Sequence, residues 1–148
     1  MRTSDGLLVI GPEERRRFGH IDLLTESTET GGRWGVVVVN ETIGTSGRTH
    51  LHRGEPEGFF ILSGEVEICG AESVTPLGPG GFALVPPDIE HTIRVLSDTA
   101  SWLAIWPSRL DGLLTERASF TGDQQALDQK HGIERGRVLD DSAGVVAD

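Results

Sequence analysis

Three histidines and one glutamate are the side chains of this sequence best suited to hold a metal ion: His50, His52, Glu57 and His91. Imidazole nitrogens and a carboxylate oxygen together suit a divalent transition ion, namely Fe(II), Ni, Mn, Co, Cu or Zn. Open positions remain on a five- or six-coordinate ion, so a small-molecule substrate, water or dioxygen can bind there. The sequence therefore predicts one divalent transition metal per chain.

Strands, rather than helices, are needed to bring these side chains together. The first two histidines are two residues apart, which places both on one face of a strand and on different faces of a helix. The turn-forming residues 54–56 allow a new strand to start at Glu57. His91 follows the turn at residues 86–88, and in a closed barrel so distant a strand can return to the same interior.

The rest of the chain has the pattern of an all-β domain, because its 20 Gly and 7 Pro are spread between short apolar runs. Strands are expected over residues 20–24, 34–40, 49–53, 57–62, 65–69, 82–85, 91–96 and 101–106. Residues 13–17 are expected to be a charged connection and residues 76–81 a turn. Helices are expected over residues 109–117 and 123–130.

Two motifs resemble those of the cupin superfamily, in particular its small single-domain quercetin dioxygenase-like members. The first motif is matched at Gly44, His50, His52, Glu57 and Gly64. The second is matched at Gly80, Pro86 and His91, with Asp88 in place of a glycine and Val95 in place of an asparagine. Aspartate tolerates turn conformations better than most residues, so the first departure is mild.

The resemblance, which spans residues 23–106, implies a cupin fold: a double-stranded β-helix, or jelly-roll barrel, with a short C-terminal helical segment. We expect one cupin domain over residues 1–138, with the barrel at about 18–106 and the helices at about 108–132. Residues 139–148 are small and acidic and are expected to form a loose tail.

The resemblance also implies a metal-dependent oxygenase, most simply a dioxygenase that acts on a small aromatic, flavonol-like or polyketide-like enol. Glu57 would be both a metal ligand and the general base, and the three histidines would hold the ion. The same site without redox chemistry could catalyse an isomerisation, cyclisation or dehydration. A non-catalytic cupin that only binds a ligand is the third alternative.

Apolar residues near these four positions are the candidates for a substrate pocket. They are expected at Trp34, Val36, Phe59, Ile61, Ile93 and Val95, chosen because each is close in sequence to a candidate ligand or belongs to a core strand. Glu55 is a second nearby carboxylate, but it lacks the motif spacing and is expected to face solvent.

Composition argues against several classes of partner. The formal net charge is -10, so the whole molecule repels phosphate backbones and anionic lipid surfaces, and neither nucleic acid nor membrane is expected. Cys69 is the single cysteine, which excludes an intrachain disulfide and favours the reducing cytoplasm. The apolar run at residues 7–10 is expected to cover an edge in a homodimer.

Overall fold

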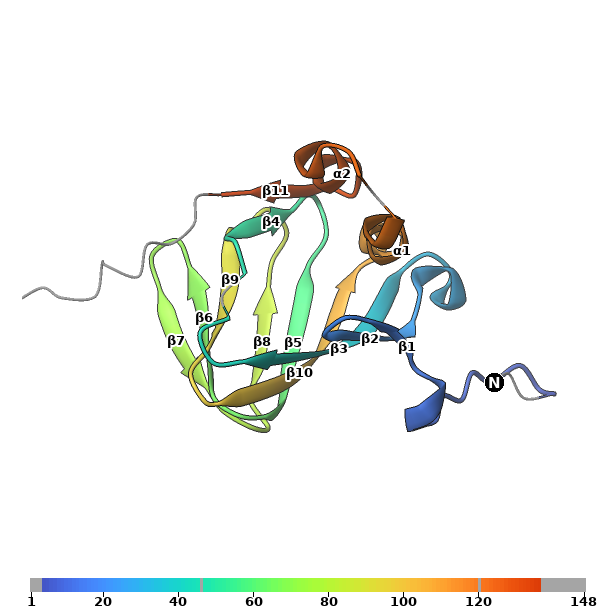
Figure 1. Ribbon diagram of the computed structural model, residues 1–148, viewed down its shortest axis with the longest axis horizontal. Helices are drawn as coiled ribbons and strands as arrows, with labels where there is room; N and C mark the ends of the chain where they lie inside the picture. Colours follow the sequence, from blue (N-terminus) through green and yellow to red (C-terminus); the bar gives the residue numbers. More distant parts are fainter. Residues whose placement is uncertain (1–3, 46, 120, 137–148) are drawn as a thin grey trace, which may run out of the picture.

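Two antiparallel β-sheets face each other and form a barrel in the computed structural model, which describes residues 4–45, 47–119 and 121–136 (Figure 1). One sheet has the strand order β1-β2-β3-β10-β5-β8 and the other the order β11-β4-β9-β6-β7. The strands are β1 (Arg16–Phe18), β2 (Ile21–Thr25), β3 (Trp34–Thr42), β4 (His50–His52), β5 (Glu57–Ser63), β6 (Val66–Gly70), β7 (Val74–Leu77), β8 (Phe82–Val85), β9 (His91–Val95), β10 (Thr99–Pro107) and β11 (Ile133–Arg135). This architecture confirms the predicted all-β jelly-roll barrel.

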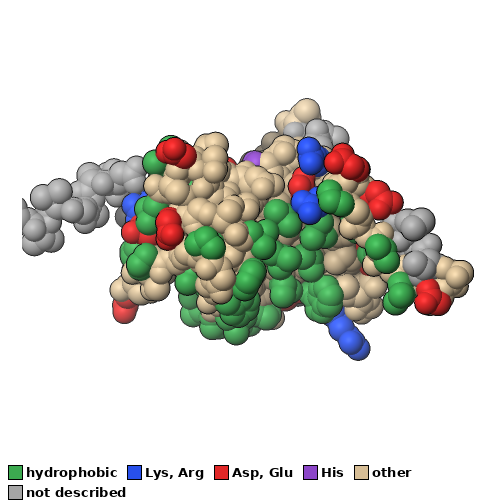
Figure 2. All heavy atoms as spheres, turned by 90° about the horizontal axis from the view of Figure 1, so that it is seen from below, with side chains coloured by type: hydrophobic (Ala, Val, Ile, Leu, Met, Phe, Trp, Pro, Cys, Tyr) green, Lys and Arg blue, Asp and Glu red, His purple; other side chains and the backbone are tan. Residues whose placement is uncertain are grey.

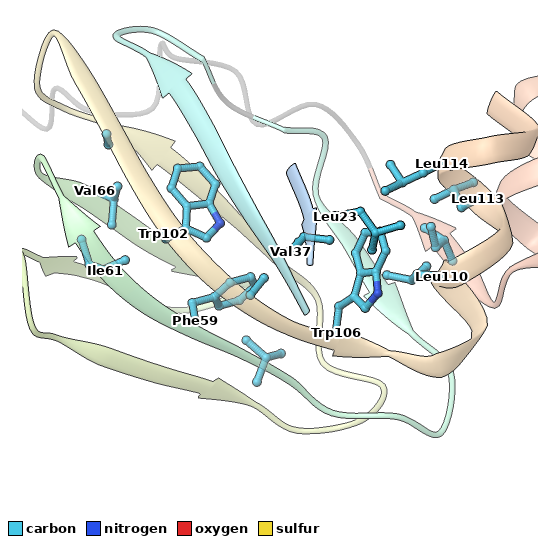
Figure 3. Packing of buried hydrophobic residues seen from close by; sticks show 14 of the residues in the cluster. Leu23, Val37, Phe59, Ile61, Val66, Trp102, Trp106, Leu110, Leu113 and Leu114 are labelled. Carbon is cyan, nitrogen blue, oxygen red and sulfur yellow. The ribbon is translucent and has the colours of Figure 1, made fainter. Parts of the chain in front are cut away.

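The barrel is filled by the inward-facing side chains of both sheets. On β10, Trp102, Ala104 and Trp106 point inward because successive residues of a strand face opposite sides. Figure 3 shows Val37 and Phe59 lying close to these tryptophans. Burial of each of these large apolar side chains contributes about 1.5–3 kcal/mol to the free energy of folding. The same burial determines which face of each strand turns inward.

Two short helices lie beside one end of the barrel (Figure 1), and they confirm the predicted C-terminal helical segment. They are α1 (Asp111–Ser119) and α2 (Gln124–Lys130); three-residue or four-residue 3₁₀ turns occur at Pro12–Glu14, Ser27–Thr30 and Ser108–Leu110. Asp123 caps α2, since its side chain accepts a hydrogen bond from the Gln125 amide at 2.9 Å. None of the described helices is long and apolar enough to cross a membrane.

Three strands were not predicted from the sequence. β7 includes Pro76, which was expected in a turn, and a proline is tolerated there because β7 is the edge strand of its sheet. β1 is also an edge strand, and its charged Arg16 and Arg17 had suggested a connection. β11 follows α2 directly and pairs with β4, so the sheet extends beyond the predicted barrel. The predicted tail at residues 139–148 lies outside the described residues.

The outer side of the larger sheet carries a group of exposed apolar side chains. They are Trp34, Phe60, Leu62, Phe82, Leu84 and Ile105, which we call the outer apolar face. Figure 2 shows hydrophobic side chains gathered over one face of the molecule. A solvated antiparallel sheet normally carries polar residues on its outer side, so this face departs from the usual alternation.

Candidate metal centre

The four predicted ligands meet inside the barrel. His50 and His52 come from β4, Glu57 is the first residue of β5 and His91 the first of β9. One potential ligand atom from each lies within 4.8 Å of all the others. His52, Glu57 and His91 are buried, and His50 is half-buried. The four side chains therefore share one site, as the sequence predicted.

Two turns with left-handed backbone conformation set the ends of these strands. Gly54, at φ 73°, lies in the turn that leads from β4 to β5. Asp88, at φ 63°, precedes β9, and its amide donates to the His52 carbonyl oxygen at 2.9 Å. This is the position where the cupin motif has a glycine, and aspartate is among the residues that tolerate this conformation.

Two imidazole rings are oriented by the backbone. The Nδ1 atom of His50 lies 3.0 Å from the Arg48 carbonyl oxygen, and that of His91 lies 2.9 Å from the Ile89 carbonyl oxygen. A carbonyl can only accept, so each Nδ1 carries the proton and donates. This arrangement leaves Nε2 of each ring to bind an ion, as is usual for histidine ligands held by a second hydrogen bond.

Glu57 occupies the middle of the site. Its Oε2 atom accepts hydrogen bonds from Nε2 of His52 at 2.9 Å and from Nε2 of His91 at 3.1 Å. Burial alone would raise the pKa of Glu57, but these two hydrogen bonds and the nearby imidazoles outweigh it and lower the pKa to about 2. Glu57 is therefore a carboxylate at neutral pH.

The pKa values of His50 and His91 are shifted in opposite directions by the surroundings of the site. Burial, together with the proximity of His91, lowers the pKa of His50 to about 4, so its ring is neutral at pH 7. Burial also acts to lower the pKa of His91, but its hydrogen bond to Glu57 outweighs burial and raises the pKa. In this hydrogen bond Nε2 of His91 donates to Glu57, and its proton would have to leave before Nε2 binds a metal ion.

The donor set fits one divalent transition ion. His50, His52 and His91 offer imidazole nitrogens and Glu57 offers one carboxylate oxygen, and all four donors surround a common point. The carboxylate balances part of the charge of a divalent cation. Nitrogen and oxygen donors in this ratio suit the same ions that the sequence suggested, and they do not choose among them.

A cavity of about 220 Å³ opens onto these four side chains. Its other lining residues are mainly apolar, and Phe59 lies beside the site, with its ring centre 5.9 Å from that of His91. The volume is below the roughly 300–1,000 Å³ of pockets for drug-sized ligands. The space therefore fits a small ligand with an apolar body.

The predicted pocket residues are divided among three places. Phe59 and Ile93 line the cavity. Ile61 and Val95 face the same interior but lie in the packed core, with 0% and 3% of their surfaces exposed.

Trp34 and Val36 were placed on the wrong side of β3. Trp34 is 44% exposed on the outer apolar face, and Val36 shares its side of the strand. Val37 and Val39 line the cavity instead. Every residue of β3 from 36 to 39 is a valine, so its apolar pattern does not indicate which side faces inward.

Several cavity residues come from outside the predicted motifs. Trp102, Ala104 and Trp106 of β10 line the cavity, and the even spacing of Trp102 and Trp106, which places both on one face of the predicted strand, was a usable signal in the sequence. The C-terminal segment adds Leu110, Leu113, Arg117, Ile133 and Arg135. Nothing in the sequence indicated that α1 and β11 would reach the metal cavity.

Glu55 does not simply face solvent, as the sequence analysis expected. It is half-buried, and its Oε1 atom accepts hydrogen bonds from the Ser108 amide at 3.0 Å and the Ser108 hydroxyl at 2.6 Å. Glu55 therefore anchors the 3₁₀ turn that leads into α1, which is a structural role.

Comparison with known proteins supports the fold. Residues 37–106 match the family model described as cupin domain. No curated protein matches the chain. The matched residues 37–106 include all four members of the candidate metal centre.

Among solved structures, the chain resembles a predicted oxalate decarboxylase from Thermotoga maritima at 19% identity, with a TM-score of 0.59 over 66% of this chain and 96% of the other. It also resembles a polyketide cyclase from Streptomyces resistomycificus at 14% identity, with a TM-score of 0.58 over 69% and 80%. A cupin-like protein from Thermotoga maritima matches at 17% identity, with a TM-score of 0.54 over 60% and 67%. Likeness at this level of identity concerns the fold alone.

Proposed function

We propose that this chain, whose residues 37–106 match the cupin domain model, is a metal-dependent enzyme that acts on a small enolisable or phenolic molecule. The observation that carries the proposal is the convergence of His50, His52, Glu57 and His91 at the floor of an apolar cavity. An ion held by four protein donors at a cavity keeps positions for a ligand, whereas a purely structural ion is usually enclosed by protein.

A divalent ion bound here supplies a Lewis acid that stabilises an enolate or phenolate oxygen, and a redox-active ion also permits reaction with dioxygen. The chain itself supplies the base. Glu57 is ionised, and it has an oxygen, Oε2, that now accepts from two imidazole nitrogens. Imidazole nitrogens that serve as ligands cannot also donate to Glu57, so a Glu57 carboxylate oxygen that leaves the ion would be free to accept a proton from a substrate hydroxyl.

The cavity limits the substrate. Phe59, Ile93, Trp102 and Trp106 offer flat or branched apolar surfaces, and these suit an aromatic or polyketide-like ring. The metal cavity itself, at about 220 Å³, fits one or two rings of such a molecule. Apolar walls also exclude water from the reacting atoms and strengthen the electrostatic effect of the site.

We favour a dioxygenase for the reaction class. In a dioxygenation both oxygen atoms enter the substrate, which itself supplies the electrons, so no separate reductant site is required. A non-redox isomerase, cyclase or dehydratase would use the same ligands and the same base. The printed names of the similar structures include a decarboxylase and a cyclase, and they leave this choice open.

Oxygen uptake separates the alternatives. Protein loaded in turn with Fe(II), Ni, Mn and Co is incubated with catechols, flavonols and small polyketide-like enols, in air and under argon, and substrate and oxygen are measured together. A dioxygenase consumes about one oxygen molecule per substrate and is inactive under argon. Equal conversion under argon would favour the non-redox enzyme. Metal-dependent binding of the panel without any conversion would favour the non-catalytic cupin.

A further inference from the structure

A second, larger cavity lies next to the metal cavity. It has a volume of about 880 Å³ and is lined by α2, β11 and the loop before β4. The two cavities share six lining residues: Glu41, Thr45, Gly47, Arg117, Ile133 and Arg135. A ligand that reaches the metal donors can therefore extend into this outer cavity.

The acidic side chains of the outer cavity already have basic or imidazole partners. The pairs are Glu41 with His20, Glu134 with Arg53 and Asp128 with Arg135. Two lining arginines, Arg48 and Arg117, make no side-chain ion pair or hydrogen bond with another residue in the described part of the chain. Among the described residues, the outer cavity thus contains two guanidinium groups that can bind an anion, although the whole chain is acidic.

Arg117 is the arginine that borders both cavities, whereas Arg48 lines the outer one alone. Leu113 and Arg117 are four residues apart on α1, which places them on one face of the helix. Leu113 lines the metal cavity, so Arg117 stands where its apolar wall ends. The side chain of Arg117 is exposed and can reorient toward a ligand.

A neutral donor lies on the same wall. The indole Nε1 of Trp106 has no hydrogen-bond partner among the described residues, although Trp106 is only 6% exposed and lines the metal cavity. Figure 3 shows Trp106 beside Leu110, at the end of the core next to α1. A buried donor without a partner is costly, and a ligand oxygen would satisfy it.

We propose that Arg117 binds a carboxylate on the part of the substrate that extends away from the metal donors. The inference rests on the proposed function, since it assumes that the substrate reaches those donors. A guanidinium matches a carboxylate in a two-bond geometry. Of the residues that the structure describes, Arg117 is the unpaired arginine at the border of the two cavities, and its single guanidinium balances the charge of a monoanionic carboxylate.

The test compares two catechol probes that differ by one carboxymethyl group, which carries the single carboxylate. Protein loaded with zinc, which is not redox-active, is titrated with 4-methylcatechol and with 3-(3,4-dihydroxyphenyl)propanoate, and heats of binding give both dissociation constants. We expect the carboxylate probe to bind about tenfold more tightly to the unmutated protein. Arg117→Gln should remove this preference, so that the two probes bind with about equal affinity. Arg33→Gln, an equal change of charge at an exposed position that lines neither cavity, should retain it.

Equal affinity of the two probes for the unmutated protein would overturn the inference, as would a preference that survives in Arg117→Gln. Loss of the preference in Arg48→Gln alone would show that the assignment to Arg117 is wrong. Metal-dependent binding of 4-methylcatechol separates this failure from failure of the proposed function. If neither probe binds the zinc-loaded protein, the proposed function and this inference fail together.

Discussion

His50 and His91 lie directly opposite each other on β4 and β9, and each ring is held through Nδ1 by the carbonyl oxygen two residues before it. Their ring centres are 4.6 Å apart. The two rings are therefore positioned by the backbone just before each of these adjacent strands and not by each other. A site built in this way is organised before any ion binds, which reduces the cost of binding.

Replacing Glu57 with glutamine separates its two predicted roles. Glutamine has nearly the same shape and keeps an oxygen that can bind an ion, but it is neutral and cannot take a proton. Activity per bound metal is expected to fall by about 10²–10⁴-fold. Turnover and metal content should be measured on the same sample, with a substrate found in the oxygen-uptake panel. A loss only in proportion to lost metal would mean that Glu57 is a ligand alone.

Two glycines of the first motif should differ sharply in their tolerance of alanine. Gly44 and Gly64 both have left-handed backbone, at φ 77° and 76°. A Cβ on Gly64 would clash with the Thr99 carbonyl oxygen, whereas one on Gly44 would meet nothing within 4 Å. Gly44→Ala should cost about 1–2 kcal/mol of unfolding free energy through backbone strain.

Gly64→Ala carries the same strain and an overpacking penalty of about 1–3 kcal/mol in addition. Urea unfolding of both variants at one pH measures the difference. Equal losses would show that the strand turn at Gly64 does not approach β10 as closely as described.

The ion pair between Asp128 of α2 and Arg135 of β11 should make stability depend on pH. Burial acts to raise the pKa of Asp128, but the hydrogen bonds from Arg135 outweigh it and lower the pKa below 3.8. A carboxyl group with a depressed pKa stabilises the fold above its unfolded-state pKa, and that contribution is lost as pH falls through the folded-state value.

Asp128→Asn should therefore lower the free energy of unfolding by about 1–3 kcal/mol at about pH 7. The difference in unfolding free energy from the unmutated protein should narrow below about pH 4. Denaturant unfolding of both proteins after treatment with a chelator avoids any effect of metal release. A gap that stays constant down to about pH 3 would contradict the role given to this pair.

We propose that two copies of the chain form a homodimer through the outer apolar face. The outward positions of β3, β10, β5 and β8 that form this face carry no charged side chain. Two copies with a formal charge of -10 each can therefore pair it about a two-fold axis without bringing acidic groups together.

Light scattering at micromolar concentration tests the dimer. Leu84→Lys should shift the protein to monomer, because Leu84 is 63% exposed on the outer apolar face. Ile43→Lys is the matched control, since Ile43 is 59% exposed elsewhere and should leave the dimer intact. Removal of residues 1–10 should also leave the dimer intact. Loss of the dimer in that variant would indicate that the run at residues 7–10 is exchanged between copies. A monomeric unmutated protein would end the proposal.

Three of the four metal ligands could be predicted from local sequence information, and His91 from the resemblance of the second motif. A two-residue spacing places His50 and His52 on one face of a strand, and a short turn fixes where Glu57 begins the next one. The walls of the cavity depend instead on long-range packing. The side of β3 that turns inward is set by its pairing with β10, in which Val37 lies opposite Ala104.

The sequence also did not predict that α1 and β11 would cover the cavity. Helical spacing predicted α1, but not that Leu113 and Arg117 would line the cavity. β11 has three residues, and it forms because β4 offers an unpaired edge to the chain that returns after α2. So short a strand, with Glu134 and Arg135 in it, has no periodic signal.

Metal content is the most direct measure of the central claim that His50, His52, Glu57 and His91 form one metal centre. Elemental analysis should be made on protein purified without chelator and again after reconstitution, alongside His50→Ala, His91→Ala and the control His20→Ala, whose exposed ring lies outside the four-residue site. We expect close to one transition metal ion per unmutated chain and per His20→Ala chain, and loss of most of it in the other two variants. Negligible metal in the reconstituted unmutated protein, or full occupancy in His50→Ala and His91→Ala, would contradict the claim.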